Sequence, residues 1–146
     1  MRSGEFMRVL PEAIRRHVPA EFRGFQWQAR NWLVQLYYED PRLHFEVWWL
    51  PGQGSRRLEL GLHFESRDAT LNQRLLERFL AHLFEIKAEL GPGMEAEMWD
   101  KGWTKVYEVR RLEGFDRETL EVVAARMAQI ITVLQPILED ALRVIR

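Results

Sequence analysis

The sequence predicts an α+β domain with the element order αβββαββα, in which helices pack mainly on one face of a five-stranded, mainly antiparallel sheet. Three observations lead to this prediction. Apolar and polar residues alternate over much of residues 32–65, as they do in half-buried strands. Helical periodicity dominates residues 70–90 and 117–143. The chain has 146 residues, of which 47% are hydrophobic, and this suits one hydrophobic core rather than several.

The composition excludes several classes of protein. The chain contains no cysteine, so disulfide frameworks, zinc–thiolate sites and thiol nucleophiles are excluded. The 21 basic residues balance 22 acidic ones, which argues against a dedicated duplex-DNA-binding protein. Charged or polar residues interrupt every apolar stretch before the roughly 18 residues that span a bilayer, so no membrane partner is expected.

Residues 1–6 read Met-Arg-Ser-Gly-Glu-Phe and are followed by a second methionine, Met7. Arg-Ser and Glu-Phe are common translations of cloning sites, so we expect residues 1–6 to be vector-derived and exclude them from the prediction of the fold, and we expect residues 7–146 to form a single domain. No signal-peptide pattern follows Met7, and the 18 arginines against 3 lysines suit a GC-rich genome. The sequence therefore predicts a cytoplasmic, prokaryotic protein.

The first half of the chain predicts one helix and three strands. Pro11 in a first turn and Pro19 as a stop predict a short helix over residues 12–18, followed by a turn-rich connection. The strands are expected at residues 32–38, 43–49 and 58–65. An antiparallel register that places Phe45 opposite both Leu36 and Leu62 puts apolar side chains on one face of a three-stranded meander. In this register Trp32 and Trp49 belong to the core.

The second half predicts a helix, a hairpin and a long helix. Thr70 and Gln73 resemble a capping box at the start of a helix over residues 70–90 that covers the apolar sheet face. A hairpin of residues 94–99 and 106–112 follows. Asp116 caps a last helix over residues 117–143, which Pro136 should kink or divide. Its apolar band is wider than one core-facing stripe, and this predicts a homodimer; the additional residues are Val122, Ile131, Val133 and Val144.

The same registers place polar side chains on the opposite face of the sheet. His44 and His63 oppose each other with Glu46 and Glu65 beside them, a set of ligands that suits zinc, manganese or acid–base chemistry. Strand-borne histidine and glutamate more often mark only a solvated sheet face, and no helical His-x-x-x-His motif supports a metal. We therefore predict no cofactor, no catalytic residue and no metal, and retain His44 and His63 as the candidates for a metal site.

Gly61 and an excess of tryptophan complete the candidate binding face. Glycine weakens a strand unless a bulge, a ligand or a neighbouring backbone needs the space, and a tolerated surface glycine is the alternative. Trp48, Trp99 and Trp103 lie outside the predicted core and suit an interface or base stacking, with partial burial at the domain edge as the alternative. The face comprises Tyr37, His44, Glu46, Trp48, Gly61, His63, Glu65, Trp99 and Trp103.

Motifs for other chemistry are weak or absent. No Walker loop, Gly-x-Gly-x-x-Gly or nucleophile elbow occurs, and a serine triad would need Ser55 or Ser66 on a turn. An enzyme is therefore disfavoured. Three arginine pairs suit phosphate contacts, but acidic neighbours make a solvated charged surface the better interpretation. These pairs are Arg15–Arg16, Arg56–Arg57 and Arg110–Arg111.

Scattered residues carry a resemblance to a known family. They are Asn31-Trp32, Leu58-Glu59-Leu60, Asn72, Ile86, Leu90-Gly91, Glu97-Met98-Trp99-Asp100-Lys101 and Leu134-Gln135-Pro136. In their spacing the chain resembles an uncharacterised domain family that often follows restriction-endonuclease-like domains. The resemblance covers much of the chain and carries over no catalytic residue. Separately, the element order is similar to that of the dimeric chaperones of type III secretion.

Three hypotheses for function follow. The leading one is a non-catalytic, homodimeric module that binds a protein or peptide through the aromatic-bearing sheet face. The resemblance implies the alternative of a nucleic-acid-associated accessory domain of a restriction or defence system. The second alternative is a metal-dependent hydrolase that uses His44, His63, Glu46 and Glu65.

Overall fold

The computed structural model describes residues 1–145, in which six strands form one open antiparallel sheet and helices pack against it. The elements in chain order are α1 (Ser3–His17), the 3-10 turn η1 (Ala20–Phe22), β1 (Gln26–Arg30), β2 (Leu33–Tyr37), β3 (Leu43–Trp49), β4 (Arg57–Phe64), α2 (Ala69–Ala81), α3 (Leu83–Leu90), β5 (Glu95–Asp100), β6 (Trp103–Arg111) and α4 (Arg117–Ile145). The strand order is β1-β2-β3-β4-β6-β5. The predicted α+β class is confirmed, with six strands instead of five.

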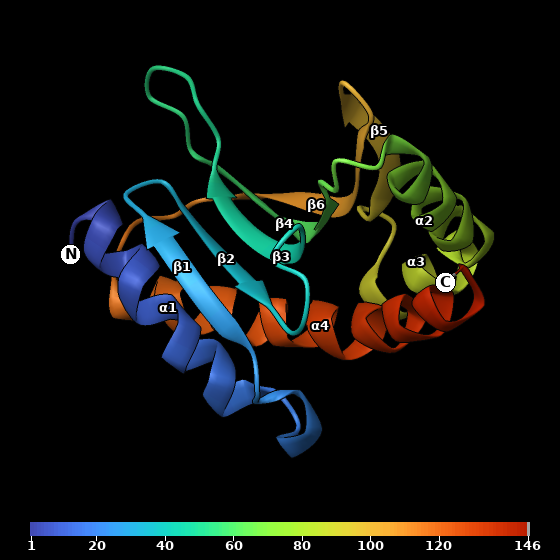
Figure 1. The fold of residues 1–146 in the computed structure, drawn as a ribbon. Coiled ribbons are helices and arrows are strands. Elements are labelled where there is room, and N and C mark those ends of the chain that lie inside the picture. Colours follow the sequence, from blue (N-terminus) through green and yellow to red (C-terminus); the bar gives the residue numbers. More distant parts are fainter. Residues whose placement is uncertain (146) are drawn as a thin grey trace.

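The predicted meander is confirmed, register included. Phe45 pairs with Leu36 on β2 and with Leu62 on β4, and all three side chains are buried. This apolar face of the sheet lies over α4, which runs beneath the strands, with α1 on one side and α2 and α3 on the other (Figure 1). Burial of alternate strand residues against these helices provides the main stabilisation of the fold.

The sixth strand, β1, is the part of the sheet that the sequence analysis missed. Polar residues alternate with Trp27 and Ala29 along it, and most of its residues are exposed because it forms an edge of the sheet. The placement of Trp32 in the core was wrong. Trp32 lies in the turn between β1 and β2 and is 48% exposed, although its carbonyl accepts the Trp49 N–H at 2.8 Å as the register requires.

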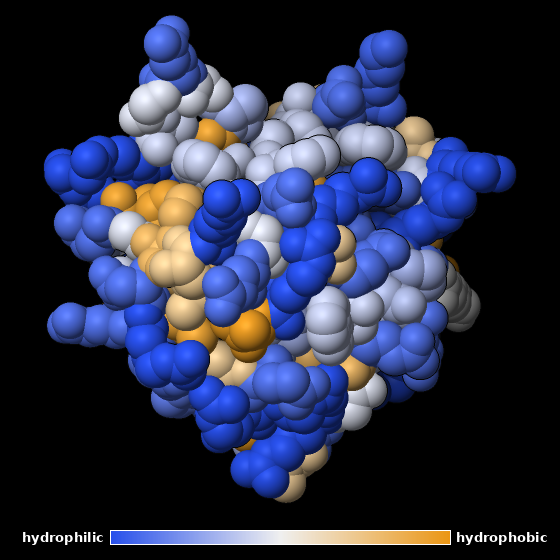
Figure 2. Space-filling model, turned by 90° about the vertical axis from the view of Figure 1, so that its left-hand side faces the viewer, coloured by the Kyte–Doolittle hydropathy of each residue, from blue (hydrophilic) through white to orange (hydrophobic). Residues whose placement is uncertain are grey.

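Helix α1 is longer than predicted. It begins at Ser3, so Pro11 lies inside the helix, and residues 3–6, which the prediction of the fold excluded, belong to its first turn. Phe6 is fully buried and contacts the ring of Phe115 at 5.3 Å between ring centres. Phe6, Met7, Leu10 and Ile14 fall on one face of the helix, and this periodicity extends through the excluded segment. Hydrophilic residues cover most of this side of the molecule, and hydrophobic ones gather mainly in one limited area (Figure 2).

The helix predicted over residues 70–90 is two helices. It breaks at His82, and its N-cap is Asp68, whose carboxylate accepts the N–H groups of Thr70 and Leu71 at 3.0 and 3.2 Å. The capping-box pattern at Thr70 therefore misplaced the N-cap by two residues. Buried Asn72 donates to the carbonyls of Ser66 and Gly102 and so ties α2 to the β5–β6 turn.

Helix α4 continues through Pro136, so the predicted division there was wrong. The predicted cap is confirmed, because Asp116 accepts the Thr119 N–H at 2.8 Å. Of the apolar surplus, Ile131 is buried in the core of this chain, whereas Val122 and Val144 remain exposed. By length and composition α4 could cross a membrane, but half of its most apolar stretch is buried within the domain, as it is in core helices.

Glu108 is a carboxylate buried on the helix-covered face of β6, where it opposes Leu60. Arg126 on α4 donates to it at 2.9 and 2.7 Å, and Arg110 donates at 2.6 Å. Burial by itself would raise the pKa of Glu108, but these hydrogen bonds and the two positive charges outweigh burial and hold the pKa below its ordinary 4.5. The ion pair therefore links the sheet to α4.

We expect Glu108→Gln to lower the free energy of unfolding at neutral pH by about 2 kcal/mol, because Arg126 loses its charged partner. Since the folded-state pKa is depressed, the stabilisation by the carboxylate is present above about pH 4.5 and is lost as the pH falls below it. Urea denaturation of both proteins at neutral and acidic pH measures the difference. If the difference in free energy of unfolding between the two proteins stayed constant down to about pH 3, the stabilising role of the ionised Glu108 would be contradicted.

Candidate metal centre

The face of the sheet opposite the helices carries a polar cluster that we call the His–Glu cluster: His44, Glu46, Glu59, His63, Glu65 and Lys105. Strand alternation directs these side chains from β3, β4 and β6 to the same side. His44 pairs directly with His63 across the β3–β4 ladder, as the predicted register requires. Their rings stack with 5.6 Å between centres and an interplanar angle of 19°.

The prediction of a solvated sheet face was wrong at this position. His44 is 2% exposed, His63 is fully buried and Glu59 is 1% exposed. The rings of Trp99 and His63 pack edge to face with 5.5 Å between their centres, and Nζ of Lys105 lies 4.9 Å from the centre of the Trp99 ring. Figure 1 shows β5 and the β3–β4 loop rising on the side of the sheet away from α4. The cluster is therefore shielded by aromatic side chains and not by helices.

His63 is held by carboxylates at both ring nitrogens. Its Nε2 lies 3.0 Å from Glu59 Oε2 and its Nδ1 lies 2.9 Å from Glu65 Oε2. Burial alone would lower the pKa of His63, but these hydrogen bonds and the charge of Glu46 raise it to about 9. Lys105 donates to the second oxygen of Glu59. In the metal-free protein His63 is therefore a cation within a buried ion-pair network.

His44 is oriented differently. Its Nδ1–H donates to the carbonyl of Pro41 at 2.8 Å, which leaves Nε2 directed at Glu46 Oε1, 3.1 Å away. Gln35 also donates to Glu46, at 3.0 Å. Burial would raise the pKa of Glu46, but the hydrogen bond from His44 and the charges of both histidines outweigh burial and lower it. Nε2 of Gln35 also lies 3.3 Å from Nε2 of His44, so the side-chain amide of Gln35 contacts both His44 and Glu46.

Four residues of the cluster present possible metal ligands at close range. His44, Glu46, His63 and Glu65 each offer one nitrogen or oxygen atom, and these four atoms all lie within 4.8 Å of one another. The two histidines and two glutamates that the sequence analysis proposed therefore lie together, and all four come from β3, β4 or the residue directly after β4. Glu65 is the most accessible of the four, with 15% of its side chain exposed.

The three tryptophans of the candidate face form one continuous aromatic array. Ring centres of Trp48 and Trp99 are 5.9 Å apart, and those of Trp99 and Trp103 are 5.7 Å apart. The indole Nε1 of Trp99 is buried and has no hydrogen-bond partner among the described residues. Tyr37 lies apart from the array, and its hydroxyl donates to Gln26 on β1 at 3.4 Å.

Gly61 is required by the backbone of the neighbouring strand. A Cβ at this position would lie 2.4 Å from the carbonyl oxygen of Val106 and 2.6 Å from Cβ of Tyr107. The interpretation as a tolerated surface glycine was therefore wrong, and the close approach of β6 explains the residue. Sequence analysis assigned no role to Lys105. The alternation of side chains along β6 was the available signal. Val106 is apolar and faces the core, so the adjacent Lys105 must lie on the opposite face of the sheet.

Most members of the arginine pairs are engaged by acidic residues. Arg16 pairs with Glu121 at 3.1 Å, and Arg110 pairs with Glu108. Arg15 bonds to Glu12 and its guanidinium lies 4.0 Å from the ring centre of Phe25. These contacts agree with the interpretation of the arginine pairs as parts of a charged surface. The acidic partners neutralise the arginines locally, so these pairs do not form a continuous basic stripe.

The fold and the cluster together define an α+β protein with an open, six-stranded antiparallel sheet and a buried His–Glu cluster on its helix-free face. No family model, curated protein or solved structure matches the chain.

Proposed function

We propose that this protein binds a divalent transition-metal ion through His44, Glu46, His63 and Glu65. The observation that carries the proposal is the convergence of four ligand atoms within 4.8 Å of one another on a buried sheet face. Two imidazoles with two carboxylates suit zinc or manganese, which bind such nitrogen and oxygen ligands well.

The distances are close to those of a tetrahedral site. Metal–ligand bonds of about 2.0–2.2 Å place neighbouring ligand atoms roughly 3.3–3.6 Å apart. Nε2 of His44 lies 3.1 Å from Glu46 and 3.8 Å from Glu65, and Nε2 of His63 lies 3.9 Å from Glu46. Small side-chain rotations therefore suffice to close the four ligands around one ion.

The surroundings of the ligands also favour a cation. The Nδ1–H of His44 is held by the Pro41 carbonyl, an arrangement that metal-bound histidines commonly use to orient the free nitrogen. Glu46, Glu59 and Glu65 bring three negative charges, against which the network offers Lys105 and the protonated form of His63. A divalent ion can replace the proton of His63 and neutralise the remaining carboxylate charge.

Metal titration tests the proposal. We expect metal-stripped protein to bind one Zn²⁺ or Co²⁺ per chain with a dissociation constant of about 1 µM or tighter, seen by calorimetry and by the visible absorption of bound Co²⁺. His44→Ala should weaken binding by about 100-fold or more, because it removes a ligand. The matched control is His17→Ala, since His17 is exposed, lies outside the His–Glu cluster and pairs with Glu121. It should bind as the wild type does.

Glu65→Gln provides a second test that does not depend on deep burial. Its side chain lies at the accessible edge of the cluster, so the variant should remain folded while its affinity for Zn²⁺ falls by about tenfold or more. Wild-type protein that binds no Zn²⁺ or Co²⁺, or a loss of affinity as large in His17→Ala as in His44→Ala, would overturn the proposal. The cluster would then be an ion-pair network only.

We further propose that the aromatic array beside the cluster forms the contact surface for a partner. Trp48, Trp99 and Trp103 supply a large amphipathic area at the mouth of the cluster, as interface tryptophans do. This supports the hypothesis of an interaction module more than that of a nucleic-acid accessory domain. A homodimer is a separate proposal, supported by the exposed Val122 and Val144 of α4, and light scattering that shows a monomer at tens of micromolar would refute it.

A further inference from the structure

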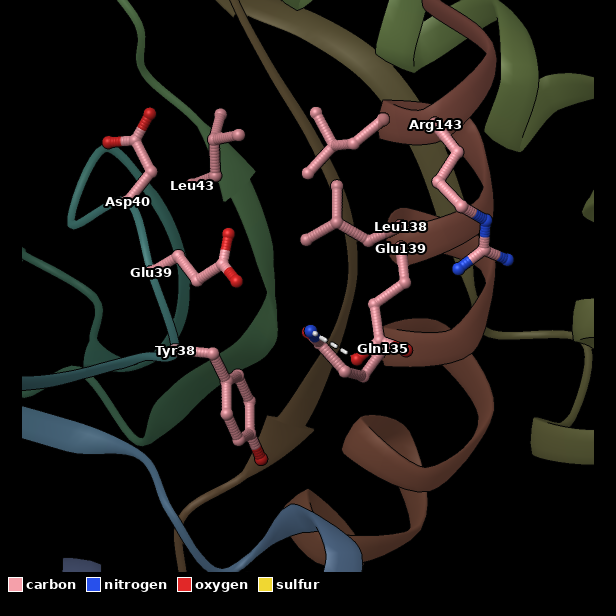
Figure 3. Close-up of a pocket in the computed structure, with 9 residues that line it drawn as sticks. Tyr38, Glu39, Asp40, Leu43, Gln135, Leu138, Glu139 and Arg143 are labelled. Atoms are coloured by element: carbon pink, nitrogen blue, oxygen red, sulfur yellow. Dashed lines mark hydrogen bonds between the residues drawn. The ribbon is translucent and has the colours of Figure 1, made fainter. Parts of the chain in front are cut away.

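A second candidate site lies on the other side of the sheet, away from the His–Glu cluster. A cavity of about 400 Å³ separates the segment that follows β2 from the C-terminal half of α4. Leu43 on β3 faces Leu138 on α4 across this space (Figure 3), and Leu142 also lines it, so these walls are apolar. Its volume suits a small organic ligand and is at the lower end for cavities that bind such molecules.

The cavity contains a buried acceptor without a donor. Gln135 is 5% exposed, and Figure 3 shows its amide group directed from α4 into the cavity towards Tyr38. Its Nε2 donates weakly to Glu139 at 3.4 Å, whereas its buried Oε1 has no hydrogen-bond partner among the described residues. Because a buried polar atom without a partner is costly, Gln135 Oε1 indicates a missing donor.

The charge of the cavity has the sign that attracts a cation. The carboxylate of Glu39, an exposed residue of the β2–β3 segment, is directed into the cavity, and the exposed Glu139 lies on the opposite wall (Figure 3). Arg143 also lines the cavity, but its guanidinium donates to Asp140 at 3.3 Å and is directed away from Glu39 and Gln135 (Figure 3).

Tyr38, which also lines the cavity, has no free donor. The hydroxyl of Tyr38 donates to the carbonyl of Phe22 at 2.7 Å. Burial and the negative charge of Glu139 raise the pKa of Tyr38, which agrees with a negative potential in this space. The cavity thus combines apolar walls with carboxylate and amide acceptors.

We propose that this cavity binds a primary alkylammonium group, as found at the end of a lysine side chain or in a free polyamine. An ammonium group offers three N–H donors, which Gln135 Oε1, Glu39 and Glu139 can accept. The alkyl stem lies against Leu43, Leu138 and Leu142, where burial of its methylene groups adds affinity. This site is independent of the metal centre and does not rest on metal binding.

Titration of ¹⁵N-labelled protein with n-butylammonium chloride tests the proposal. We expect saturable chemical-shift changes confined to the amides of residues 38–43 and 135–143, whereas n-butanol, which has the same stem without the charge, causes none at equal concentration. Glu39→Gln and Gln135→Leu should each weaken binding by about tenfold. The matched control is Glu118→Gln, an exposed glutamate in the first turn of α4, which should bind as the wild type does.

Two further ligands identify the source of the ammonium group. Nα-acetyl-lysine amide represents the side chain of a peptide, and spermidine represents a free polyamine; saturable binding of either supports the proposal, and the tighter ligand identifies the source. The proposal is overturned if none of the three amines shifts these amides at about 50 mM, a concentration well above the millimolar affinity of weak ligands. Equal binding of n-butanol, or unchanged affinity in Glu39→Gln, overturns it as well.

Discussion

Replacing Gly61 with alanine is expected to destabilise the protein by about 3 kcal/mol or more. The added Cβ would lie 2.4 Å from the Val106 carbonyl oxygen and 2.7 Å from Cα of Tyr107, and both are backbone atoms that no side-chain rotation can move away. Strand β6 must therefore shift at the centre of the β4–β6 ladder, where Gly61 pairs with Tyr107. Thermal and urea denaturation of the purified variant measure the loss.

Gly24→Ala is the matched control for this substitution. A Cβ at Gly24 meets nothing within 4 Å, and its backbone does not adopt a positive φ. The added methyl group should change the free energy of unfolding by no more than about 0.5 kcal/mol. If Gly61→Ala were as stable as Gly24→Ala, the close approach of β6 to β4 would be wrong.

Lys105→Met is expected to lower the free energy of unfolding of the metal-free protein by about 3 kcal/mol or more. Methionine keeps most of the volume of the stem but removes the ammonium group that neutralises Glu59 and lies 4.1 Å from the ring centre of Tyr107. Glu59 is 1% exposed, so it cannot regain the lost interaction from water. Urea denaturation in the presence of a chelator measures this loss.

The same variant connects stability to the metal proposal. Zn²⁺ should restore part of the stability of Lys105→Met, because a bound cation supplies positive charge to the same carboxylates and stabilises only the folded state. Lys101→Met is the control, since Lys101 is exposed in the β5–β6 turn and should change stability little. A Lys105 variant within about 1 kcal/mol of the wild type would show that the network is accessible to water.

Much of the candidate site could be predicted because strand alternation is a local property. Once the apolar positions of β3 and β4 are matched, His44 and His63 must oppose each other on the other face, and the structure confirms this pairing. The burial of the histidines could not be predicted in this way. It depends on Trp99, which comes from the β5–β6 hairpin and packs against His63 only because β6 lies beside β4.

Lys105 was missed for the same reason. Its ammonium group pairs with Glu59 on β4, which lies 46 positions away in the chain, and no local sequence pattern predicts that pair. The cavity at Gln135 is a further example, since it forms where the β2–β3 segment faces the far end of α4. Two boundaries were also misplaced. The N-cap of α2 is Asp68 and not Thr70, and α1 begins at Ser3 because its apolar face extends through Phe6.

The sequence by itself determined the α+β class, the meander with its register, the cap of α4 and the residues that face away from the core. These features follow from local patterns in the sequence, chiefly the two-residue period of side chains along a strand and the 3.6-residue period along a helix. Only the tertiary structure decided the strand order, the burial of the His–Glu cluster beneath Trp99, the need for glycine at position 61 and the acidic cavity beside α4. Each of these depends on the distance between segments far apart in the chain, which is set by how the whole core packs.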